Sequence, residues 1–471
     1  MWSIFSEQGL FLAYGAMLSV IATSPFWGKN YSVMSPWTLL ALAIVLSCGI
    51  RGAILSLGWE GRFPLDRLWT LGVEPTFYSY PSFVYALALL TAVAGYQLPK
   101  AFNKGSPGSI EPDRAGRTHR TFGPWAIYVV YLFAAIGAVA LIAYVQATGG
   151  FSLSSLSQKR TTIDSVQLTS TYQSHGALRF INQFSSVAFW VAIALRRSQV
   201  ANRSQPGIFG FIEMGLLGLN AIALPFYASS RAEVVNILIV ALAIRFLTGR
   251  GGIKVRNLVT LALITLVALS FMTYSRAQNQ GAAQSALTAT TVFTTIPEGI
   301  IYDRNFGDMS TTAQIIQRVP DQLPYAKGST IATWLVAPIP RSVWPEKPLI
   351  SAGPIIGTTV FGTDRSGVPP GYVAEFYWNF GLTGTLIGGA LLGAILRFLE
   401  SRFSLAWMFQ EPVIAVLYSA TAFRFGMFAI SGGLGSSIYR LVGDLATTGL
   451  VLLLVQTRRQ KSGRVKASSR G

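Results

Sequence analysis

The sequence predicts an all-α polytopic membrane protein with about 11 (10–13) transmembrane helices. Composition is the first reason: the 471 residues are 51% hydrophobic and only 12% charged, whereas a soluble domain carries about 25% charged residues. The second reason is the recurrence of apolar runs of about 20 residues, the length that crosses a bilayer. We expect these helices at 8–26, 37–57, 82–98, 124–147, 179–196, 208–228, 232–248, 256–275, 376–397, 408–430 and 437–457.

Lysine and arginine residues gather in alternate connections between the predicted helices. They lie in the segments 98–123, 196–203, 250–256, 397–402 and 458–471, which fall on one side of the membrane if the helices alternate. Basic loops stay in the cytoplasm, so we expect the N-terminus outside and the C-terminus inside. We therefore assign the net charge of +18 to this topology and to anionic membrane lipids, and predict no nucleic-acid partner.

Four regions follow from this topology. Residues 1–275 form a transmembrane bundle of about eight helices, and 276–375 form a large extracytoplasmic loop region whose apolar patches predict short helices. Residues 376–457 hold the C-terminal transmembrane helices, and 458–471 form a basic cytoplasmic tail; we expect the chain after Gln456 to be disordered. The first apolar run has no charged segment before it, so we expect a spanning helix and not a cleaved signal.

Arginines at the predicted outer ends of helices are the first candidate site residues. Arg231 opens the helix at 232–248, and Arg276 follows the helix at 256–275. Charges beside the hydrocarbon core are costly and mark functional sites. The planar guanidinium group makes two hydrogen bonds to a phosphate. These residues predict a lipid pyrophosphate site; the alternative is simple snorkelling of each side chain to the interface.

A proline-rich motif at 338–348 carries the next candidates. Its four prolines fix φ and exclude a regular helix. The stiff segment would hold Arg341 and Lys347 in place as a clamp for pyrophosphate, with Trp344 beside them as a surface for a sugar. The alternative is a structural turn with solvated charges.

The run from 371 to 384 leads from the large loop into the next predicted helix. Glu375 stands at the expected helix start and is the first choice as general base or orienter of a sugar hydroxyl. Its alternative role is that of a carboxylate favoured by the helix dipole. Tyr377 and Asn379 are expected to stack on and hydrogen-bond to the glycan.

The outer loop at 148–178 adds a second set. Arg160, Tyr172 and Arg179 at its end are expected to bind substrate, and His175 is a second candidate base, or simply an exposed histidine. We predict no metal, because the chain has only two histidines and Cys48 as its single cysteine. Asp303 and Asp308 are a weaker alternative as ligands of a divalent ion.

These motifs resemble the oligosaccharide repeat unit polymerases, the O-antigen polymerase (Wzy) type, over about residues 225–400. The pieces that carry the resemblance are Ser230-Arg231, Pro340-Arg341, Trp344-Pro345, Lys347-Pro348, Glu375-Phe376-Tyr377 and Asn379-Phe380-Gly381. The N-terminal third contains no piece that matches.

The resemblance implies a fold of the GT-C class of membrane glycosyltransferases. It also implies an activity that polymerises glycans carried on undecaprenyl pyrophosphate, at the outer face of the bacterial inner membrane. Such enzymes take no nucleotide sugar, so no cofactor is expected, and a chain-length regulator is implied as a partner. Two alternatives stay open, a lipid-linked glycan ligase and a lipid-linked glycan transporter or flippase.

Overall fold

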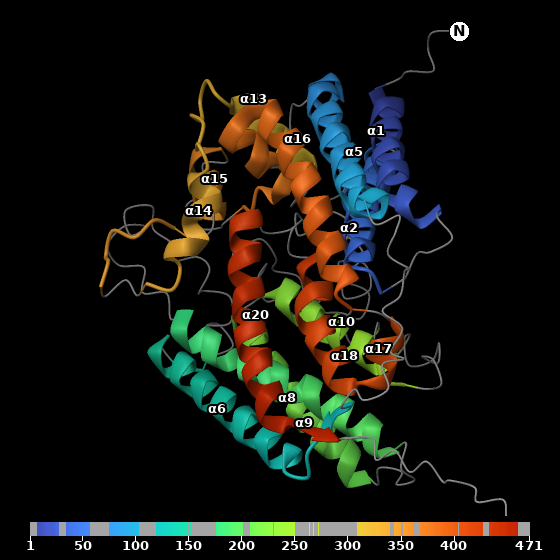
Figure 1. Ribbon diagram of the computed structural model, residues 1–471. Helices are drawn as coiled ribbons and strands as arrows, with labels where there is room; N and C mark the ends of the chain where they lie inside the picture. Colours follow the sequence, from blue (N-terminus) through green and yellow to red (C-terminus); the bar gives the residue numbers. More distant parts are fainter. Residues whose placement is uncertain are drawn as a thin grey trace, which may run out of the picture.

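The computed structural model describes most of the predicted helices (Figure 1). The described residues are 7–27, 34–56, 75–102, 119–148, 150–151, 176–200, 208–228, 230–249, 309–339, 343–349, 352–360, 368–403, 405–426 and 433–459, with 263, 267 and 272. Among them, 8 helices are long and apolar enough to cross a membrane. They are Gly9–Trp27, Pro36–Ala53, Thr76–Leu98, Ala126–Ala147, Gly176–Ser198, Ile208–Tyr227, Gly371–Ser401 and Leu434–Val455.

The first group of helices surrounds one apolar core (Figure 1). Its members are α1 (Glu7–Thr23) with the short η1 (Ser24–Trp27), α2 (Pro36–Ile44), the π-helix η2 (Val45–Ile50), α3 (Arg51–Ser56), η4 (Pro75–Tyr78), α5 (Ser79–Phe102) and α16 (Gly371–Ser401). The start of α2 is fixed locally, because Ser35 accepts a hydrogen bond from the Trp37 backbone N–H at 3.2 Å and a proline follows it. Trp37 Nε1 then donates to the Ala22 carbonyl at 2.9 Å and ties α2 to α1.

Small residues let α5 and α16 approach closely. A Cβ added at Gly389 would collide with the Ala88 carbonyl oxygen, and one added at Gly393 with the Ala92 carbonyl oxygen. Small residues four apart allow such contact between apolar helices, where packing replaces the hydrophobic effect.

The helix α16 is broken inside its run. Phe380 has φ −143° and ψ 18°, and Gly381 has φ +64° and ψ −152°, neither of which is helical. Such a break frees backbone groups. The residues just before α14 (Ser329–Val336) bond two of these freed groups. Ala326 N donates to the Trp378 carbonyl at 3.0 Å, and Lys327 N donates to the Asn379 carbonyl at 3.2 Å. The break at Asn379-Phe380-Gly381 is therefore the place where the residues before α14 attach to α16.

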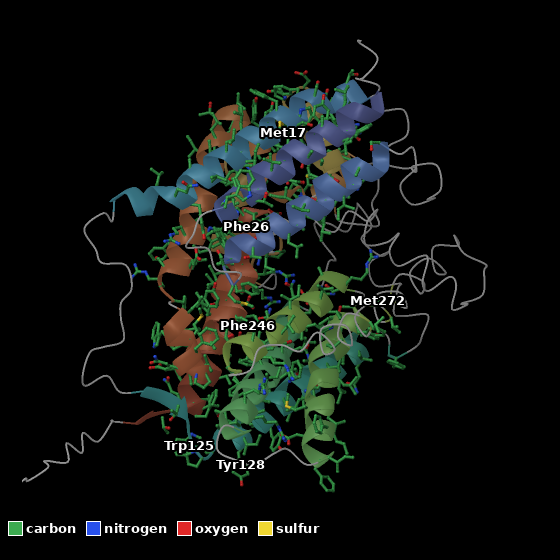
Figure 2. The ribbon with its side chains drawn as sticks, turned by 90° about the vertical axis from the view of Figure 1, so that its right-hand side faces the viewer. Met17, Phe26, Trp125, Tyr128, Phe246 and Met272 are labelled. Atoms are coloured by element: carbon green, nitrogen blue, oxygen red, sulfur yellow. The ribbon has the colours of Figure 1, made fainter. Side chains whose placement is uncertain are left out.

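The second group of helices packs around a separate apolar core, in the lower part of the molecule in Figures 1 and 2. It consists of α6 (Ala126–Ala147), α8 (Gly176–Val200), α9 (Ile208–Tyr227), α10 (Arg231–Leu247), α17 (Leu405–Gln410), α18 (Pro412–Tyr418), the π-helix η6 (Ser419–Phe423) and α20 (Leu434–Val455). Asn182 donates to the Gly137 carbonyl at 2.8 Å, and Trp190 Nε1 to the Ile237 carbonyl at 3.1 Å. These bonds fix α8 between α6 and α10.

Two short strands form the exception to the all-helical prediction. Strand β1 (His119–Phe122) pairs antiparallel with β2 (Gln456–Arg459), with Thr121 opposite Thr457. Figure 2 shows Trp125 and Tyr128 at the same end of the molecule. The expectation that the chain is disordered after 456 is therefore wrong for 457–459, because β1 supplies backbone partners; residues 460–471 lie outside the described residues. The pair joins two segments that the lysine and arginine pattern places on one side.

Other boundaries differ from the predicted ones. The helix at 232–248 is the 17-residue α10, and the run at 408–430 is interrupted before Pro412, which starts a shorter apolar helix, Pro412–Gly426. Proline has no N–H to continue the preceding helix, so α17 ends before it. The predicted helix at 256–275 lies almost entirely outside the described residues.

The described part of 276–375 contains three short helices. They are α13 (Met309–Arg318), α14 (Ser329–Val336) and α15 (Gly353–Thr359). The helix α13 packs on α5 and α16, and α14 packs on α20. This packing places α13 against the first group of helices and α14 against the start of α20.

Candidate anion site at the ends of α8, α10 and α20

Two ion pairs connect α20 to its neighbours. Arg440 Nη2 lies 2.7 Å from Glu233 Oε1 in the first turn of α10, and both side chains are about one-third exposed, at 35% and 30%. Arg424, directly after η6, places Nη1 2.7 Å from Asp444 Oδ1 on α20, and these side chains are only 7% and 6% exposed. A nearly buried ion pair inside apolar helices is costly to bring out of water and needs good geometry.

A third arginine approaches from α8. Arg179 lies close enough to Glu233 to act on its charge, together with Arg440 and Arg424. Its guanidinium donates to the Tyr144 hydroxyl at 2.7 Å and lies over that ring, 5.3 Å from the centroid. The Arg424 guanidinium lies over Trp190 at 5.6 Å from the centroid. Aromatic faces of this kind stabilise cations in surroundings poor in water.

We name Arg179, Glu233, Arg424, Arg440 and Asp444 the charged cluster. Among the described members, three guanidinium groups lie with two carboxylates. Arg231 opens α10 two residues before Glu233, a spacing that puts the two side chains on different sides of the helix. The N-terminal end of α10 also carries a partial positive charge from its dipole. Guanidinium groups gathered in this way are suited to a phosphate or pyrophosphate anion.

Arg179 and Glu233 lie at the starts of the helices predicted at 179–196 and 232–248, which the sequence places on the outer side. Arg424, Arg440 and Asp444 lie further inside the runs at 408–430 and 437–457. The structure thus brings one predicted site residue, Arg179, to the charged cluster. It adds residues that the sequence analysis did not select.

Four members of the charged cluster were not selected in the sequence analysis, Glu233 and three charges inside predicted spanning runs. Arg424 lies inside the apolar run at 408–430, and Arg440 and Asp444 lie inside the run at 437–457. A signal was present, because a charge within a membrane-spanning run marks a functional site by default. Their pairing partners follow only from the arrangement of helices that are distant in the chain.

The prediction that Glu375 stands at a helix start is wrong, because α16 begins four residues earlier, at Gly371. Its buried carboxylate instead accepts a hydrogen bond from the backbone N–H of Leu434, at the start of α20. The helix dipole that favours this carboxylate is that of α20. Since Arg440 and Asp444 are six and ten residues further along, they lie about 9 and 15 Å along the helix axis.

Asn379 and Lys347 are both held by protein atoms. The Asn379 amide accepts from Gly328 N at 2.7 Å and donates to Thr330 Oγ1 at 2.7 Å and to the Glu375 carbonyl at 2.7 Å. Lys347 is buried, and its Nζ donates to the carbonyls of Ala337 at 2.8 Å and Ile339 at 2.7 Å, just past α14. A cation at that helix end is favoured by the dipole. These bonds hold the two ends of α14.

Two of the three aromatic candidates, Tyr377 and Trp344, lie within the described residues. The Tyr377 hydroxyl is 3.2 Å from that of Tyr80 on α5, so this side chain belongs to the first group of helices. Trp344 is exposed in the turn after α14. The remaining candidates lie outside the described residues. They are Arg160, Tyr172, His175, Arg276 and Arg341, together with Asp303 and Asp308.

The described residues contain no group of three or more His, Cys, Asp or Glu side chains arranged to hold a metal ion. Comparisons with protein families, with curated proteins and with solved structures find no match to this chain. The class defined by the fold and site is therefore that of a helical membrane protein with a cationic cluster among its helix ends.

Proposed function

We propose that this protein is a membrane glycosyltransferase that polymerises undecaprenyl-pyrophosphate-linked oligosaccharide repeat units into a long surface polysaccharide. The product class is an O-antigen, a capsule or an exopolysaccharide. The observation that carries the proposal is the charged cluster, which gathers three arginines, from α8, α20 and the residue after η6, around Glu233 of α10. The resemblance at 225–400 supports the same assignment, and with it a fold of the GT-C class.

The reaction needs positive charge where its leaving group forms. The oxygen of an acceptor hydroxyl attacks the anomeric carbon of the donor glycan. A new glycosidic C–O bond forms, and the bond from that carbon to the pyrophosphate oxygen breaks. Undecaprenyl pyrophosphate leaves with the electron pair, while the hydroxyl proton passes to a base. Fixed guanidinium groups stabilise the charge that develops on the departing oxygen.

Arg440, Arg179 and Arg231 take the leaving pyrophosphate in this proposal. Arg276 and Arg341 supply further positive charge for the leaving diphosphate in the same proposal. Glu375 stays the first choice as base and His175 the second. The Glu375 carboxylate also orients the start of α20, which carries Arg440.

The proposed setting is the bacterial inner membrane, with the site on the extracytoplasmic face. The basic segments, which include the tail, face the cytoplasm in this arrangement. Lipid-linked oligosaccharide is then the substrate partner, and a chain-length regulator is a protein partner taken from the resemblance alone.

Purified protein in liposomes, supplied with lipid-linked repeat units alone, tests the proposal. We expect a ladder of products that differ by one repeat unit. A ligase needs a different acceptor and would give no ladder. A flippase would move the substrate across the bilayer without changing its mass. Either of these results with folded protein contradicts the proposed polymerase.

A further inference from the structure

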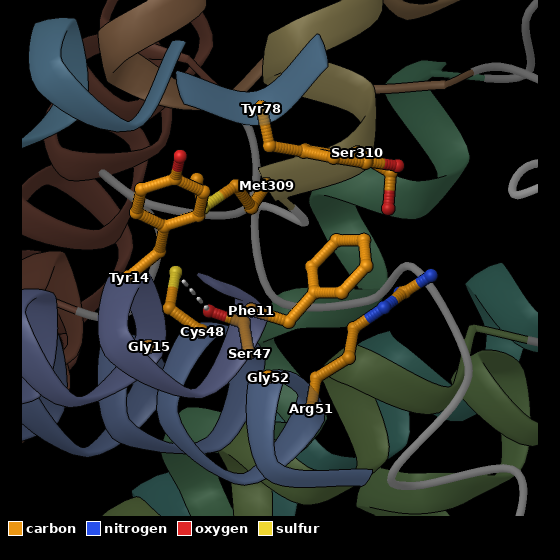
Figure 3. A pocket seen from close by; sticks show the side chains of 10 residues that line it. All are labelled: Phe11, Tyr14, Gly15, Ser47, Cys48, Arg51, Gly52, Tyr78, Met309 and Ser310. Atoms are coloured by element: carbon orange, nitrogen blue, oxygen red, sulfur yellow. Dashed lines mark hydrogen bonds between the residues drawn. The ribbon is translucent and has the colours of Figure 1, made fainter. Parts of the chain in front are cut away.

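Arg51 and Arg197 are arginines of the spanning helices that the proposed chemistry does not use. Arg51 begins α3 and lines a pocket with Phe11 of α1 and Met309 of α13 (Figure 3). The free space in this pocket, about 20 Å³, accommodates about one water molecule, so the pocket is too small for a substrate group. Arg197 lies instead in the last turn of α8, half-buried, on the predicted cytoplasmic side.

A second guanidinium group lies near Arg197. It belongs to Arg245 in the last turn of α10, close enough for the two positive charges to repel one another. The Arg197 guanidinium also lies beside the residues that follow α10, because a Cβ added at Gly249 would stand 2.8 Å from its Nη2 atom. Two like charges held together at the ends of neighbouring helices destabilise the protein unless an anion joins them.

Within the described residues, neither Arg197 nor Arg245 has a carboxylate partner. The Nε atom of Arg197 is buried and makes no hydrogen bond to any of these residues. Its chain neighbour Arg196 differs, because it forms an ion pair with Glu213 near the start of α9. The C-terminal dipole of α10 supplies only about half a negative charge, too little to balance two guanidinium groups.

The adjoining chain adds positive charge and no negative charge. No Asp or Glu occurs between Asp164 and Glu213, or between Glu233 and Glu298. The predicted cytoplasmic segments next to the two helix ends contain further cations, which are Arg203, Arg250, Lys254 and Arg256. The pair formed by Arg197 and Arg245 therefore favours an anion that is not part of the chain.

The surroundings of the pair favour a lipid over a soluble anion. Ile208 and Phe209, at the start of α9, are 73% and 83% exposed, and α9 packs on α8. Phe246, next to Arg245, packs against Phe409 of α17 with 6.0 Å between ring centroids, and Phe409 is half exposed. Exposed apolar surface on membrane helices contacts acyl chains, so acyl chains and a phosphate group both find partners here.

We propose that Arg197 and Arg245 bind the headgroup phosphate of an anionic phospholipid in the cytoplasmic leaflet. Each planar guanidinium group can give two parallel hydrogen bonds to phosphate oxygens, and basic sites between spanning helices on this side bind such headgroups. The bound phosphate replaces repulsion between α8 and α10 by attraction to both. Because α8 and α10 carry Arg179 and Glu233 near their other ends, the lipid also stabilises the helices that form the charged cluster.

Native mass spectrometry of the purified full-length protein tests the proposal. The probes are phosphatidylglycerol, which is anionic, and phosphatidylcholine, which is zwitterionic, each titrated in detergent. We expect the tightest phosphatidylglycerol to bind at least about tenfold more weakly to Arg197→Met and to Arg245→Met, because each variant loses charge-assisted hydrogen bonds. Arg402→Met removes an exposed arginine on the same predicted side and should bind as the unaltered protein does. Phosphatidylcholine should bind all four proteins alike.

Thermal melting distinguishes lipid binding from a purely structural role. In phosphatidylcholine alone, neither Arg197→Met nor Arg245→Met should lower the melting temperature, because each removes the repulsion between like charges. Added phosphatidylglycerol should raise the melting temperature of the unaltered protein and of Arg402→Met, and not that of the two other variants. Arg197→Lys keeps the charge but loses the planar fork, so we expect a smaller gain than in the unaltered protein.

Three results would overturn the proposal. The first is equal phosphatidylglycerol affinity of the unaltered protein, Arg197→Met and Arg245→Met. The second is an equal loss of affinity in Arg402→Met, which would show an effect of net charge alone. The third is equal stabilisation by inorganic phosphate, which would assign the pair to a soluble anion. Neither measurement involves glycan transfer, so their outcome is independent of the proposed function.

Discussion

Arg440 on α20 and Glu233 in the first turn of α10 form an ion pair of 2.7 Å between Nη2 and Oε1. The pair joins two helices whose sequences are separated by the whole outer segment. It leaves about one-third of each side chain exposed, so the guanidinium remains within reach of a further anion. The same contact thus fixes the helices and presents a cation.

Exchanging the two charges separates these roles. In Arg440→Glu/Glu233→Arg the ion pair is restored in reverse, so we expect thermal stability close to that of the unaltered protein. An exposed pair contributes under about 1 kcal/mol, so even Arg440→Met should remain folded. We expect the rate of ladder formation to fall at least about 100-fold in both variants, because the cation that stabilises the leaving group is removed or moved to another helix.

Arg402→Met serves as the control for loss of one arginine and should keep the ladder. Thermal melting in detergent and gel analysis of the products give the two measurements. Full polymerisation by the exchanged variant would show that Arg440 acts only through its pair with Glu233.

The Arg424–Asp444 pair should behave differently because it is almost fully buried. Asp444→Asn leaves a buried guanidinium without its countercharge, at a cost of about 3–5 kcal/mol. Arg424→Met/Asp444→Leu removes both charges and should recover most of the lost melting temperature. Equal destabilisation of the single and double variants would contradict an uncompensated charge as the cause.

Glu375 is predicted to stabilise the start of α20. In Glu375→Gln the amide oxygen can still accept from the Leu434 N–H, but the negative charge that strengthens this buried bond at the start of α20 is lost, and we expect a loss of about 1–3 kcal/mol. Glu346→Gln, an exposed carboxylate in the turn after α14, is the matched control and should melt normally. Normal melting of Glu375→Gln with complete loss of the ladder would instead favour a role as general base alone.

The break in α16 is predicted to depend on Gly381. Its φ of +64° and ψ of −152° suit glycine almost exclusively, so Gly381→Ala should cost about 1–3 kcal/mol. The added Cβ would also lie 3.2 Å from the Tyr325 hydroxyl oxygen. Gly449→Ala on α20 meets nothing within 4 Å and should be neutral or gain up to about 1 kcal/mol. Equal melting temperatures for the two variants would contradict the strained joint.

The strand pair offers a test of orientation. With Cys48 replaced by alanine, Thr121→Cys and Thr457→Cys should form a disulfide under mild oxidation, because these residues are register partners. Either single variant should react with a membrane-impermeant maleimide only after spheroplasts are opened. Phe151→Cys, exposed in the predicted outer loop, is the control that should react in intact spheroplasts. Reaction of the Thr121→Cys variant in intact spheroplasts would reverse the predicted topology.

Most helices could be predicted because an apolar run of about 20 residues is a local property of the chain. The runs at 8–26, 124–147 and 208–228 match the described helices within a few residues. The predicted boundaries of helices were wrong where a contact with a distant part of the chain determines them. Residues 457–459 form a strand only because β1 lies beside them, and α16 starts early because the outer segment packs against it.

Only part of the candidate site could be predicted, because the sequence shows local features and not contacts between distant helices. Arg179 and Arg231 were selected because a charge at the end of an apolar run is visible in the sequence. The pairing of Arg424 with Asp444 is not visible, because it depends on how η6 and α20 meet.

The sequence by itself therefore determined a chain of apolar helices with basic segments in alternate connections, since hydrophobicity and charge act residue by residue. Only the tertiary structure decided which charges face one another. That outcome depends on helix packing, such as the approach of α20 to α10, and on the low dielectric constant that makes every buried charge require a partner.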